Sequence, residues 1–275
     1  MDHYRNKIAL VTGGASGIGR GLTEALARRG ATVVCADINA DGAQKTVSSI
    51  QRGRGSARAA RLDVTREDEV NRIVDETVAR YGRLDFMFNN AGIGIGGEFR
   101  DTTTEHWRRI IQVNLWGAIY GTTAAYRVMI RQGFGSIVNM ASIAGLLPVP
   151  TLAAYAAVKH AVVGLSISIR PEAADLGVRV CVVCPGAVDT GLFKTTPILG
   201  ADKEGLLERF PFVMDVETAV PKILRGVRRN KAVIVFPLSN CLLWRFYRMW
   251  PAAVAPLSLK MVRDFRKFRK EDAKT

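Results

Sequence analysis

The fold of this chain is decided near its start, by the stretch Lys7-Ile-Ala-Leu-Val-Thr-Gly13-Gly-Ala-Ser-Gly17-Ile-Gly19-Arg-Gly-Leu-Thr-Glu-Ala-Leu26. The apolar run at 8–11 is typical of a buried strand in a parallel sheet, and helix-forming residues follow the glycines. Strand, glycine-rich turn and helix form the context that a dinucleotide-binding motif requires. The glycines let the backbone approach a pyrophosphate, and the helix N-terminus offers free N–H groups. The alternative is a glycine-rich turn that binds no ligand.

A second signal lies mid-chain in Tyr155-Ala-Ala-Val-Lys159, with Ser142 upstream. On a helix, a separation of four residues places two side chains on one face. An ammonium a few ångströms from a phenol, at an effective dielectric of about 20, favours the phenolate by up to roughly 4 kcal/mol before desolvation subtracts. We therefore expect Lys159 to lower the pKa of Tyr155 from its ordinary value of about 10 toward neutrality.

These signals recur in the order and spacing of one known family. The motifs are Thr12-Gly-x-x-x-Gly-x-Gly19, Asn89-Asn-Ala-Gly92, Asn114, Ser142, Tyr155, Lys159 and Pro185-Gly186. Over residues 5–236 the chain resembles the short-chain dehydrogenase/reductase family. The resemblance implies a Rossmann-type α/β fold, a doubly wound parallel sheet of seven strands in the order 3-2-1-4-5-6-7 with helices on both faces. It also implies a dinucleotide-binding and catalytic domain over residues 1–236 and a basic, aromatic extension over residues 237–275.

Apolar runs alternate with helical segments along the domain, which by itself predicts a parallel, doubly wound sheet. The expected strands are residues 8–11, 31–36, 57–64, 84–88, 136–140, 178–183 and 232–236. The expected helices are residues 18–29, 41–51, 67–81, 104–131, 153–176 and 215–229. Pro171 falls inside one of them, where proline removes a backbone hydrogen bond and clashes with the preceding turn. We expect a kink or break near residues 167–171, in a helix that the family commonly uses for oligomerisation.

The second strand indicates which dinucleotide is bound. It ends in Asp37, eighteen residues after Gly19 and close to the offset at which a carboxylate receives the ribose hydroxyls of NAD. This carboxylate would repel the 2′-phosphate of NADP, and position 38 carries no basic residue. Arg20 is the one nearby cation that could complicate this interpretation. We expect NAD, with NADP less favoured; in the alternative, Asp37 is only a turn residue.

The resemblance assigns the other cofactor contacts to the carboxyl ends of strands. Asp63 and Val64 would border the adenine ring, and Val188 and Thr190 would hold the nicotinamide amide. The expected cofactor-binding residues are Gly13, Ser16, Gly17, Ile18, Gly19, Asp37, Asp63, Val64, Asn90, Ala91, Gly92, Tyr155, Lys159, Pro185, Gly186, Val188 and Thr190.

The resemblance also implies the chemistry, which is the interconversion of a secondary alcohol and a ketone. Tyr155 would be the general acid and base, and Ser142 would orient the substrate oxygen. Lys159 would lower the tyrosine pKa and hold the nicotinamide ribose. Asn114 matches an asparagine that holds a proton-relay water. The expected catalytic residues are thus Asn114, Ser142, Tyr155 and Lys159; the alternative function is a cofactor-binding scaffold at a membrane surface without redox turnover.

Substrate contacts are expected from residues 93–99, 143–152 and 191–214. The last segment is apolar for a mobile lid, with Gly191-Leu-Phe-Lys, Ile198-Leu-Gly, Leu206-Leu and Phe210-Pro-Phe-Val-Met. It contains no cluster of arginines to meet a phosphate or carboxylate. The sequence therefore favours a lipophilic alcohol or ketone over a sugar or hydroxy acid.

The composition is that of an ordinary globular protein, with 48% hydrophobic and 23% charged residues. We expect a cytoplasmic protein, because the first strand begins too early for a signal peptide and no long apolar run is present. Cys181 and Cys184 would point to opposite faces of a strand, so neither a disulfide nor a shared metal is expected. The three histidines are scattered, and we assign no metal site.

The formal charge is +14, and from position 241 onward nine Lys or Arg stand against three Asp or Glu. Leu257, Met261, Phe265 and Phe268 fall at helical spacing between cations, after an aromatic group of Trp244, Phe246, Tyr247 and Trp250. Such a helix suits a membrane surface, or it packs on the core or on a subunit partner; the sequence leaves both open. The expected partners are an alcohol or ketone substrate and further copies of the chain, in a homodimer or homotetramer. A membrane surface is a partner in the first of these two alternatives. No nucleic acid is expected, because no reader motif accompanies the basic residues.

Overall fold

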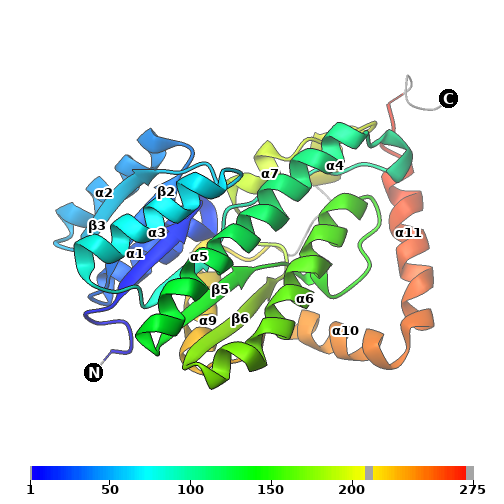
Figure 1. The fold of residues 1–275 in the computed structure, drawn as a ribbon. Helices are drawn as coiled ribbons and strands as arrows, with labels where there is room; N and C mark the ends of the chain where they lie inside the picture. The colour runs from blue at the N-terminus through cyan, green and yellow to red at the C-terminus, as the bar shows by residue number, and fades with distance from the viewer. Residues whose placement is uncertain (1, 208–212, 271–275) are drawn as a thin grey trace.

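One parallel sheet organises the chain, and the structure, a computed structural model, describes residues 2–207 and 213–270 (Figure 1). Its strands are β1 (Ile8–Thr12), β2 (Thr32–Asp37), β3 (Ser56–Arg61), β4 (Phe86–Asn89), β5 (Gly135–Met140), β6 (Val178–Pro185) and β7 (Val233–Phe236). Their order is β3-β2-β1-β4-β5-β6-β7, and every neighbouring pair is parallel. The predicted fold class and strand order are confirmed.

Helices cover both faces of the sheet because successive strand residues are apolar on both sides. Leu10 packs in one buried cluster and its neighbour Val11 in another. One face carries α1 (Gly17–Arg28), α2 (Ala40–Arg52) and α9 (Val216–Arg228); the other carries α3 (Glu67–Tyr81), α5 (Gly117–Gln132) and α6 (Ala153–Asp175). The remaining α-helices of the described chain are α4 (Thr104–Ile111), α7 (Gly191–Thr195), α8 (Lys203–Leu207), α10 (Leu238–Met249) and α11 (Ala255–Arg266).

Two expected elements differ in the structure. Strand β3 ends at Arg61 rather than at residue 64, because the Asp63 carboxylate accepts hydrogen bonds from the Thr65 amide and hydroxyl and turns the chain. The helix expected over residues 104–131 is interrupted by a π-helical turn, η2 (Gln112–Trp116), between α4 and α5. Such turns commonly lie at functional sites.

Of the kink or break expected near residues 167–171, the break is wrong, since α6 is helical from Ala153 to Asp175 with Pro171 inside it. Pro171 lies on the exposed face, and the buried Ala173 keeps the last turn packed against the sheet. The Arg170 guanidinium also donates to the carbonyl oxygens of Val180 and Asn230, which ties this end of the helix to its surroundings. Packing therefore outweighs the one hydrogen bond that proline removes.

As expected, Cys181 and Cys184 point to opposite faces of β6. Cys181 and Cys184 are both free and buried, and they belong to different apolar clusters. None of the helices described is long and apolar enough to cross a membrane.

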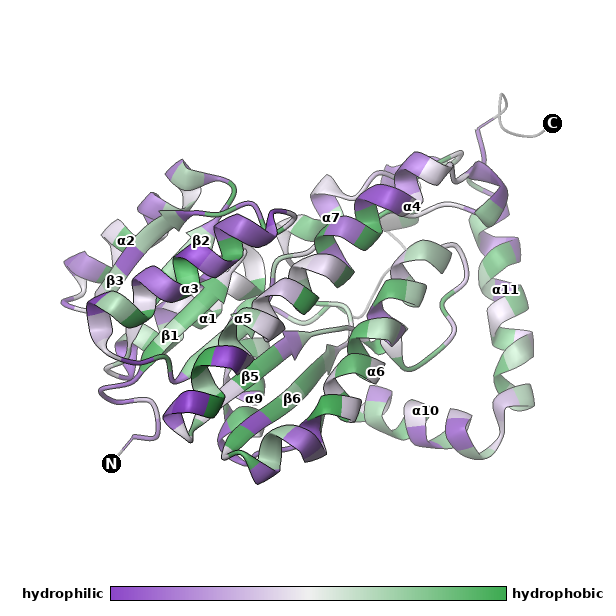
Figure 2. Ribbon diagram, in the orientation of Figure 1, coloured by the Kyte–Doolittle hydropathy of each residue, from purple (hydrophilic) through white to green (hydrophobic). Residues whose placement is uncertain are grey.

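The C-terminal extension forms an arm made of α10, the short helix η4 (Pro251–Val254) and α11. Figure 1 shows α10 at the lower right and α11 rising along the right-hand side, and Figure 2 shows apolar and polar residues mixed along both. Phe265 is buried and Phe268 is half-buried, so the packing alternative describes this end of the extension. Leu257 and Met261 remain exposed.

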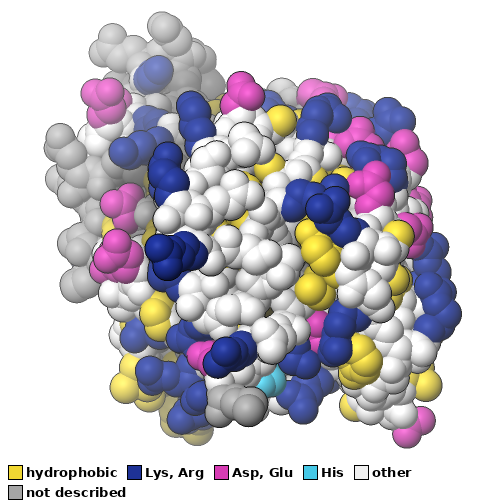
Figure 3. Space-filling model, turned by 90° about the vertical axis from the view of Figure 1, so that its left-hand side faces the viewer, with side chains coloured by type: hydrophobic (Ala, Val, Ile, Leu, Met, Phe, Trp, Pro, Cys, Tyr) yellow, Lys and Arg dark blue, Asp and Glu magenta, His cyan; other side chains and the backbone are white. Residues whose placement is uncertain are grey.

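Positive charge is not confined to the extension. Figure 3 looks onto the left-hand side of Figure 1, at the opposite end of the molecule, and shows Lys and Arg side chains spread over that face.

Candidate active site

The glycine-rich loop has the geometry of an anion cradle. Gly13 and Gly17 have φ angles of +68° and +51°, in the left-handed region that favours glycine. A Cβ added at Gly19 would lie 2.0 Å from the Gly13 carbonyl oxygen, so only glycine fits there. The Ser16 side chain makes no capping hydrogen bond, and the first N–H groups of α1, among them that of Ile18, lack intrahelical partners. The residues present thus fit the pyrophosphate of a dinucleotide.

Asp37 stands at the carboxyl end of β2, next to this loop. Its carboxylate accepts from the Ala15 amide and from the Asn39 amide, each at 2.9 Å. These bonds orient the carboxylate beside the turn. Arg20 is ion-paired with Glu24 at 2.8 Å and is therefore directed along α1.

The end of β4 is fastened to the end of β1 by two side chains. The Asn90 amide group donates to the Thr12 carbonyl oxygen at 2.9 Å, and the Thr12 hydroxyl accepts from the backbone amides of Asn90 and Ala91 at 3.0 Å. No separate role was predicted for Thr12 from the sequence. The feature of the sequence that points to Thr12 is its hydroxyl group at the last position of a buried strand, directly before a glycine-rich turn.

Asn114 lies in the π-helical turn and is 2% exposed. Its side-chain oxygen accepts from the Ile93 amide at 2.8 Å, and its side-chain nitrogen donates to the Ile93 carbonyl oxygen at 2.9 Å. A Cβ added at Gly92 would lie 3.0 Å from that side-chain oxygen and 3.7 Å from Lys159 Nζ. The Asn114 side chain therefore positions the segment after β4 beside Lys159.

Ser142, Tyr155 and Lys159 meet at the carboxyl end of β5. The Ser142 hydroxyl accepts from the Ala144 amide at 3.2 Å, and the Ser142 side chain acts to lower the pKa of Tyr155. Lys159 is 4% exposed, and its Nζ donates to the Met140 carbonyl oxygen at 2.8 Å. The arrangement brings a hydroxyl, a phenol and an ammonium to one place, as the sequence predicted.

The expected lowering of the tyrosine pKa is not found in the protein alone. Burial raises the pKa of Tyr155 to about 12, against the opposing effect of the Ser142 hydroxyl. Burial also lowers the pKa of Lys159 to about 8. The physical reason is that desolvation disfavours both charged forms, and the ammonium lies 5.6 Å from the centre of the phenol ring.

The end of β6 closes the opposite side of the loop. After Pro185, the Gly186 amide donates to the Phe236 carbonyl oxygen at 2.8 Å. Val188 is buried, and the Thr190 hydroxyl caps α7 by accepting from the Leu192 amide. A Cβ built at the first residue of α1 would lie 3.0 Å from Thr190 Cβ, so the end of β6 lies against the glycine-rich loop.

Asp63 and Val64 lie farther along the same edge of the sheet. The Asp63 carboxylate is engaged by Thr65, and Val64 is buried beside the start of α5. Apart from Tyr155 and Lys159, which lie on α6, the expected cofactor residues thus follow the carboxyl ends of strands, where open parallel sheets bind ligands.

The substrate side is built from three loops linked by backbone hydrogen bonds. Gly96 donates to the Pro197 carbonyl oxygen at 3.0 Å and accepts from the Leu199 amide at 2.8 Å, while the Gly97 amide donates to the Thr151 carbonyl oxygen at 2.7 Å. Helices α7 and α8 form the described part of the expected lid. Its apolar run at 210–212 lies outside the described residues.

The C-terminal extension contacts this side through a cluster of ion pairs that was not predicted from the sequence. Glu98 is 8% exposed and pairs with Arg266 and Arg269, each at 2.7 Å. Arg269 also pairs with Asp101 at 2.9 Å. The signal for this contact in the sequence is a matched spacing: the two acids at 98 and 101 are three residues apart, and so are the two arginines at 266 and 269.

Backbone bonds reinforce this contact. The Asp202 amide donates to the Phe268 carbonyl oxygen at 2.8 Å, and the Lys270 amide donates to the Gly200 carbonyl oxygen at 3.2 Å. The end of the extension is therefore attached to the loop between α7 and α8. In the described parts of the chain, no three His, Cys, Asp or Glu gather where they could hold a metal ion.

Comparison with known proteins agrees with this geometry. Residues 7–197 match the short chain dehydrogenase family. The chain is 39% identical over 192 residues to cyclohexanol dehydrogenase of Acinetobacter sp. (strain SE19), covering 70% of this chain and 76% of the relative. It is 37% identical over 227 residues to cyclopentanol dehydrogenase of Comamonas testosteroni, covering 80% and 90%. A crystal structure of a short-chain dehydrogenase/reductase from Burkholderia phymatum in complex with NAD is similar, with a TM-score of 0.83, 25% identity, and coverage of 90% and 95%.

Proposed function

The chain belongs to the short-chain dehydrogenase/reductase family, and on that premise we propose that it is an NAD-dependent oxidoreductase that interconverts a secondary alcohol and a ketone. The observation that carries the proposal is the meeting of Ser142, Tyr155 and Lys159 beside a glycine-rich loop that fits a pyrophosphate. A bound nicotinamide dinucleotide would supply the hydride donor or acceptor, a role that no side chain provides.

The chain's own residues would move the proton. In ketone reduction, the Tyr155 hydroxyl donates its proton to the carbonyl oxygen; in alcohol oxidation, the phenolate accepts the proton of the alcohol. The Ser142 hydroxyl donates to the same substrate oxygen and holds it against the phenol. Lys159 has ammonium protons left after its bond to Met140, and these would stabilise the phenolate and bind the ribose. Asn114 would act by positioning the segment that carries Gly92 and Ile93.

Support for NAD over NADP comes from the end of β2. The Asp37 carboxylate is held beside the loop by the Ala15 amide, where it would accept from the ribose hydroxyls and repel a 2′-phosphate. Ile38, which is 61% exposed, offers an apolar surface rather than a cation. Arg20, the nearby cation, is already paired with Glu24. The similar Burkholderia phymatum structure is a complex with NAD.

The proposed substrate is a lipophilic, uncharged alcohol or ketone. Leu146 and Leu147 are buried on the substrate side, and Ile95 is buried with Ala154 and Val158 next to the catalytic tyrosine. Three arginines that the structure describes beside these loops, Arg100, Arg266 and Arg269, form ion pairs with Glu98 and Asp101. Two relatives named for cyclic alcohols, cyclohexanol and cyclopentanol, support the same class.

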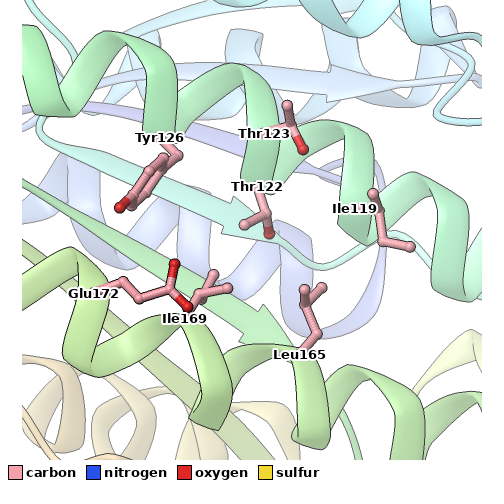
Figure 4. Close-up of a pocket in the computed structure, with 7 residues that line it drawn as sticks. All are labelled: Ile119, Thr122, Thr123, Tyr126, Leu165, Ile169 and Glu172. Atoms are coloured by element: carbon pink, nitrogen blue, oxygen red, sulfur yellow. The ribbon is translucent and has the colours of Figure 1, made fainter.

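We also propose that the protein forms a homodimer or homotetramer through α5 and α6. A groove of about 150 Å³ runs between these helices (Figure 4). Its lining is mainly apolar, with Tyr126 and Glu172 at one end and Ile119 and Leu165 at the other. Ile130 and Ile167, on the same two helices, are 36% and 46% exposed. A second proposed partner is a membrane surface, reached through the extension at residues 237–275.

The test of the enzymatic proposal is oxidation of cyclohexanol, cyclopentanol and longer secondary alcohols with NAD⁺ or NADP⁺, followed by absorbance of the reduced cofactor. We expect turnover with NAD⁺ and faster turnover on apolar alcohols than on sugars or hydroxy acids. If NADH binds but no alcohol or ketone of the panel is converted, a cofactor-binding scaffold is the better description.

A further inference from the structure

A second cavity lies at the opposite edge of the sheet from β3, away from the catalytic residues. Its volume is about 300 Å³, at the lower end of the range for small-ligand pockets. It lies along β7, the edge strand that pairs only with β6, and is bounded by α9 and the start of α10. The lining residues are Lys222, Arg225, Gly226, Arg229, Lys231, Ile234, Val235, Phe236, Leu238 and Cys241.

The rim of this cavity is uniformly positive. Lys222, Arg225, Arg229 and Lys231 line it, no lining residue is acidic, and none of these cations forms an ion pair within residues 2–207 and 213–270. The floor is apolar, because Ile234 and Phe236 are buried. A cationic rim over an apolar floor suits a ligand with a phosphate and an adjoining hydrocarbon part.

An exposed apolar stripe leads directly away from this cavity along α10. It consists of Leu238, Leu242, Phe246, Met249 and Trp250, which are 72%, 57%, 44%, 66% and 56% exposed. The first four stand at i, i+4, i+8 and i+11, so they share one helix face. Trp244 packs on the other side, in the apolar cluster that contains Val233 and Val235. Because Trp244 anchors one side of α10 to the core, the face of α10 that carries the stripe, here called the α10 stripe, points away from the protein.

We propose that this pocket and the α10 stripe together form a docking surface for an anionic phospholipid membrane, with the lipid phosphate in the cationic rim and the stripe in the headgroup region. Leu238 belongs to both parts, so charge and apolar surface are continuous. Arg245 and Arg248 are exposed on the same helix and add to the attraction. This inference rests on the proposed membrane contact of the extension, and it assigns that contact to α9, β7 and α10 rather than to the end of α11.

Charge argues against a second copy of the chain as the occupant. A two-fold contact would place the same patch on both partners, so the four cations of one rim would face the four of the other. An anionic bilayer instead neutralises the rim and buries the stripe at once. The leucine, methionine, phenylalanine and tryptophan side chains of the stripe also favour binding to the headgroup region of a membrane over binding of a fully polar, soluble anion.

The experiment uses the full chain and sedimentation with two kinds of vesicle, phosphatidylcholine alone and equal parts phosphatidylcholine and phosphatidylglycerol. The wild type is expected on the anionic vesicles only. Arg225→Glu with Arg229→Glu should weaken that binding at least about ten-fold, because each cation near an anionic surface contributes on the order of a five-fold change. The matched control is Lys45→Glu with Arg228→Glu, two exposed cations outside the pocket, which should bind nearly as the wild type does.

Further measurements separate the alternatives. Leu242→Ser with Met249→Ser should reduce vesicle binding and leave a remainder that salt abolishes. Equal losses in the pocket variant and its control would overturn the proposal in favour of general charge attraction. Stabilisation by glycerol phosphate without vesicle binding would overturn it in favour of a soluble anion, and loss of a dimer in the stripe variant would point to a second copy. Turnover of a soluble ketone, measured without vesicles, should be unchanged in all variants, so its failure tests the enzymatic proposal separately.

Discussion

Lys159 Nζ lies 5.6 Å from the centre of the Tyr155 ring and donates to the Met140 carbonyl oxygen at 2.8 Å. The distance from the ammonium to the ring follows from the four-residue separation of the two residues on α6. The distance to the carbonyl oxygen follows from the position of Met140 at the end of β5. Gly145 permits this close packing, because a Cβ there would lie 2.6 Å from the Lys159 carbonyl oxygen. The ammonium is therefore held in a fixed place under the phenol, although burial keeps the pKa of Tyr155 high in the protein alone.

Replacing Tyr155 by Phe removes the proton partner and keeps the ring. We expect kcat for ketone reduction to fall by about 10²- to 10⁴-fold, the usual contribution of a general acid. NADH binding, measured by fluorescence titration, should change little, because the cradle of Gly13 to Gly19 is untouched. A variant that retains more than about a tenth of wild-type kcat would remove Tyr155 from the role of general acid.

Replacing Asp37 by Ser and Ile38 by Arg should shift the cofactor preference toward NADPH. The change removes a carboxylate that would bind ribose hydroxyls, at a cost of about 1.5–3 kcal/mol in NADH binding, and supplies a cation for the 2′-phosphate. Dissociation constants for both cofactors, measured on both proteins, check this. Ile38→Arg alone is the control, and tighter binding of NADPH than NADH by the wild type would contradict the interpretation of β2.

The fold and most of the candidate site could be predicted because local patterns encode them. Strand–turn–helix at residues 8–26 and the pairing of Tyr155 with Lys159 are short-range. The expected site residues other than Asn114, Tyr155 and Lys159 lie at or just after the carboxyl ends of strands. The sequence could not give the balance between desolvation and charge at Tyr155. That balance depends on how deeply the folded chain buries the ring and the ammonium.

The docking of the extension was also beyond the sequence pattern. Glu98 and Arg269 are 171 residues apart, and the matched i,i+3 spacing of the two acids and the two arginines does not by itself indicate that they pair. Phe265 and Phe268 share a helical spacing with Leu257 and Met261, yet the first two are buried or half-buried while the other two are exposed. One apolar stripe in the sequence thus divides into a packed end and an exposed end.

Replacing Glu98 by Gln should make the free energy of unfolding change less as the pH falls into the acid range. The hydrogen bond from Arg266, with further support from Arg100, holds the pKa of Glu98 at about 2, below its ordinary value of 4.5. A lowered folded pKa means that the stabilisation is present in full above pH 4.5 and is lost as pH falls toward 2. Near neutral pH, the free energy of unfolding of the wild type should be larger than that of the variant by about 2 kcal/mol. This value is reduced from the full effect of the pKa shift because solvent screens the charges of this peripheral cluster.

Urea unfolding of both proteins over this pH range measures the difference. Glu105→Gln, which breaks an exposed pair with Arg108, is the matched control and should cost far less. A difference between wild type and Glu98→Gln that stays constant down to pH 2 would show that the Arg266 contact does not control this ionisation.

A chain that ends at Trp250 should keep its cofactor site and lose affinity for substrate. This end point retains α10, whose Trp244 packs in a core cluster and whose Asn240 would meet any Cβ at Gly186. It removes the attachment of residues 266–270 to the loop between α7 and α8. We expect KM for a ketone to rise about ten-fold, equivalent to about 1.4 kcal/mol, while the dissociation constant of NADH stays near that of the full chain.

Glu98→Gln with Asp101→Asn releases the same contact without removing a helix, and should also raise KM. If both proteins fold and bind ketone as tightly as the full chain, the extension does not shape the substrate side; if the truncated chain alone loses NADH binding, its role is structural support of the whole domain.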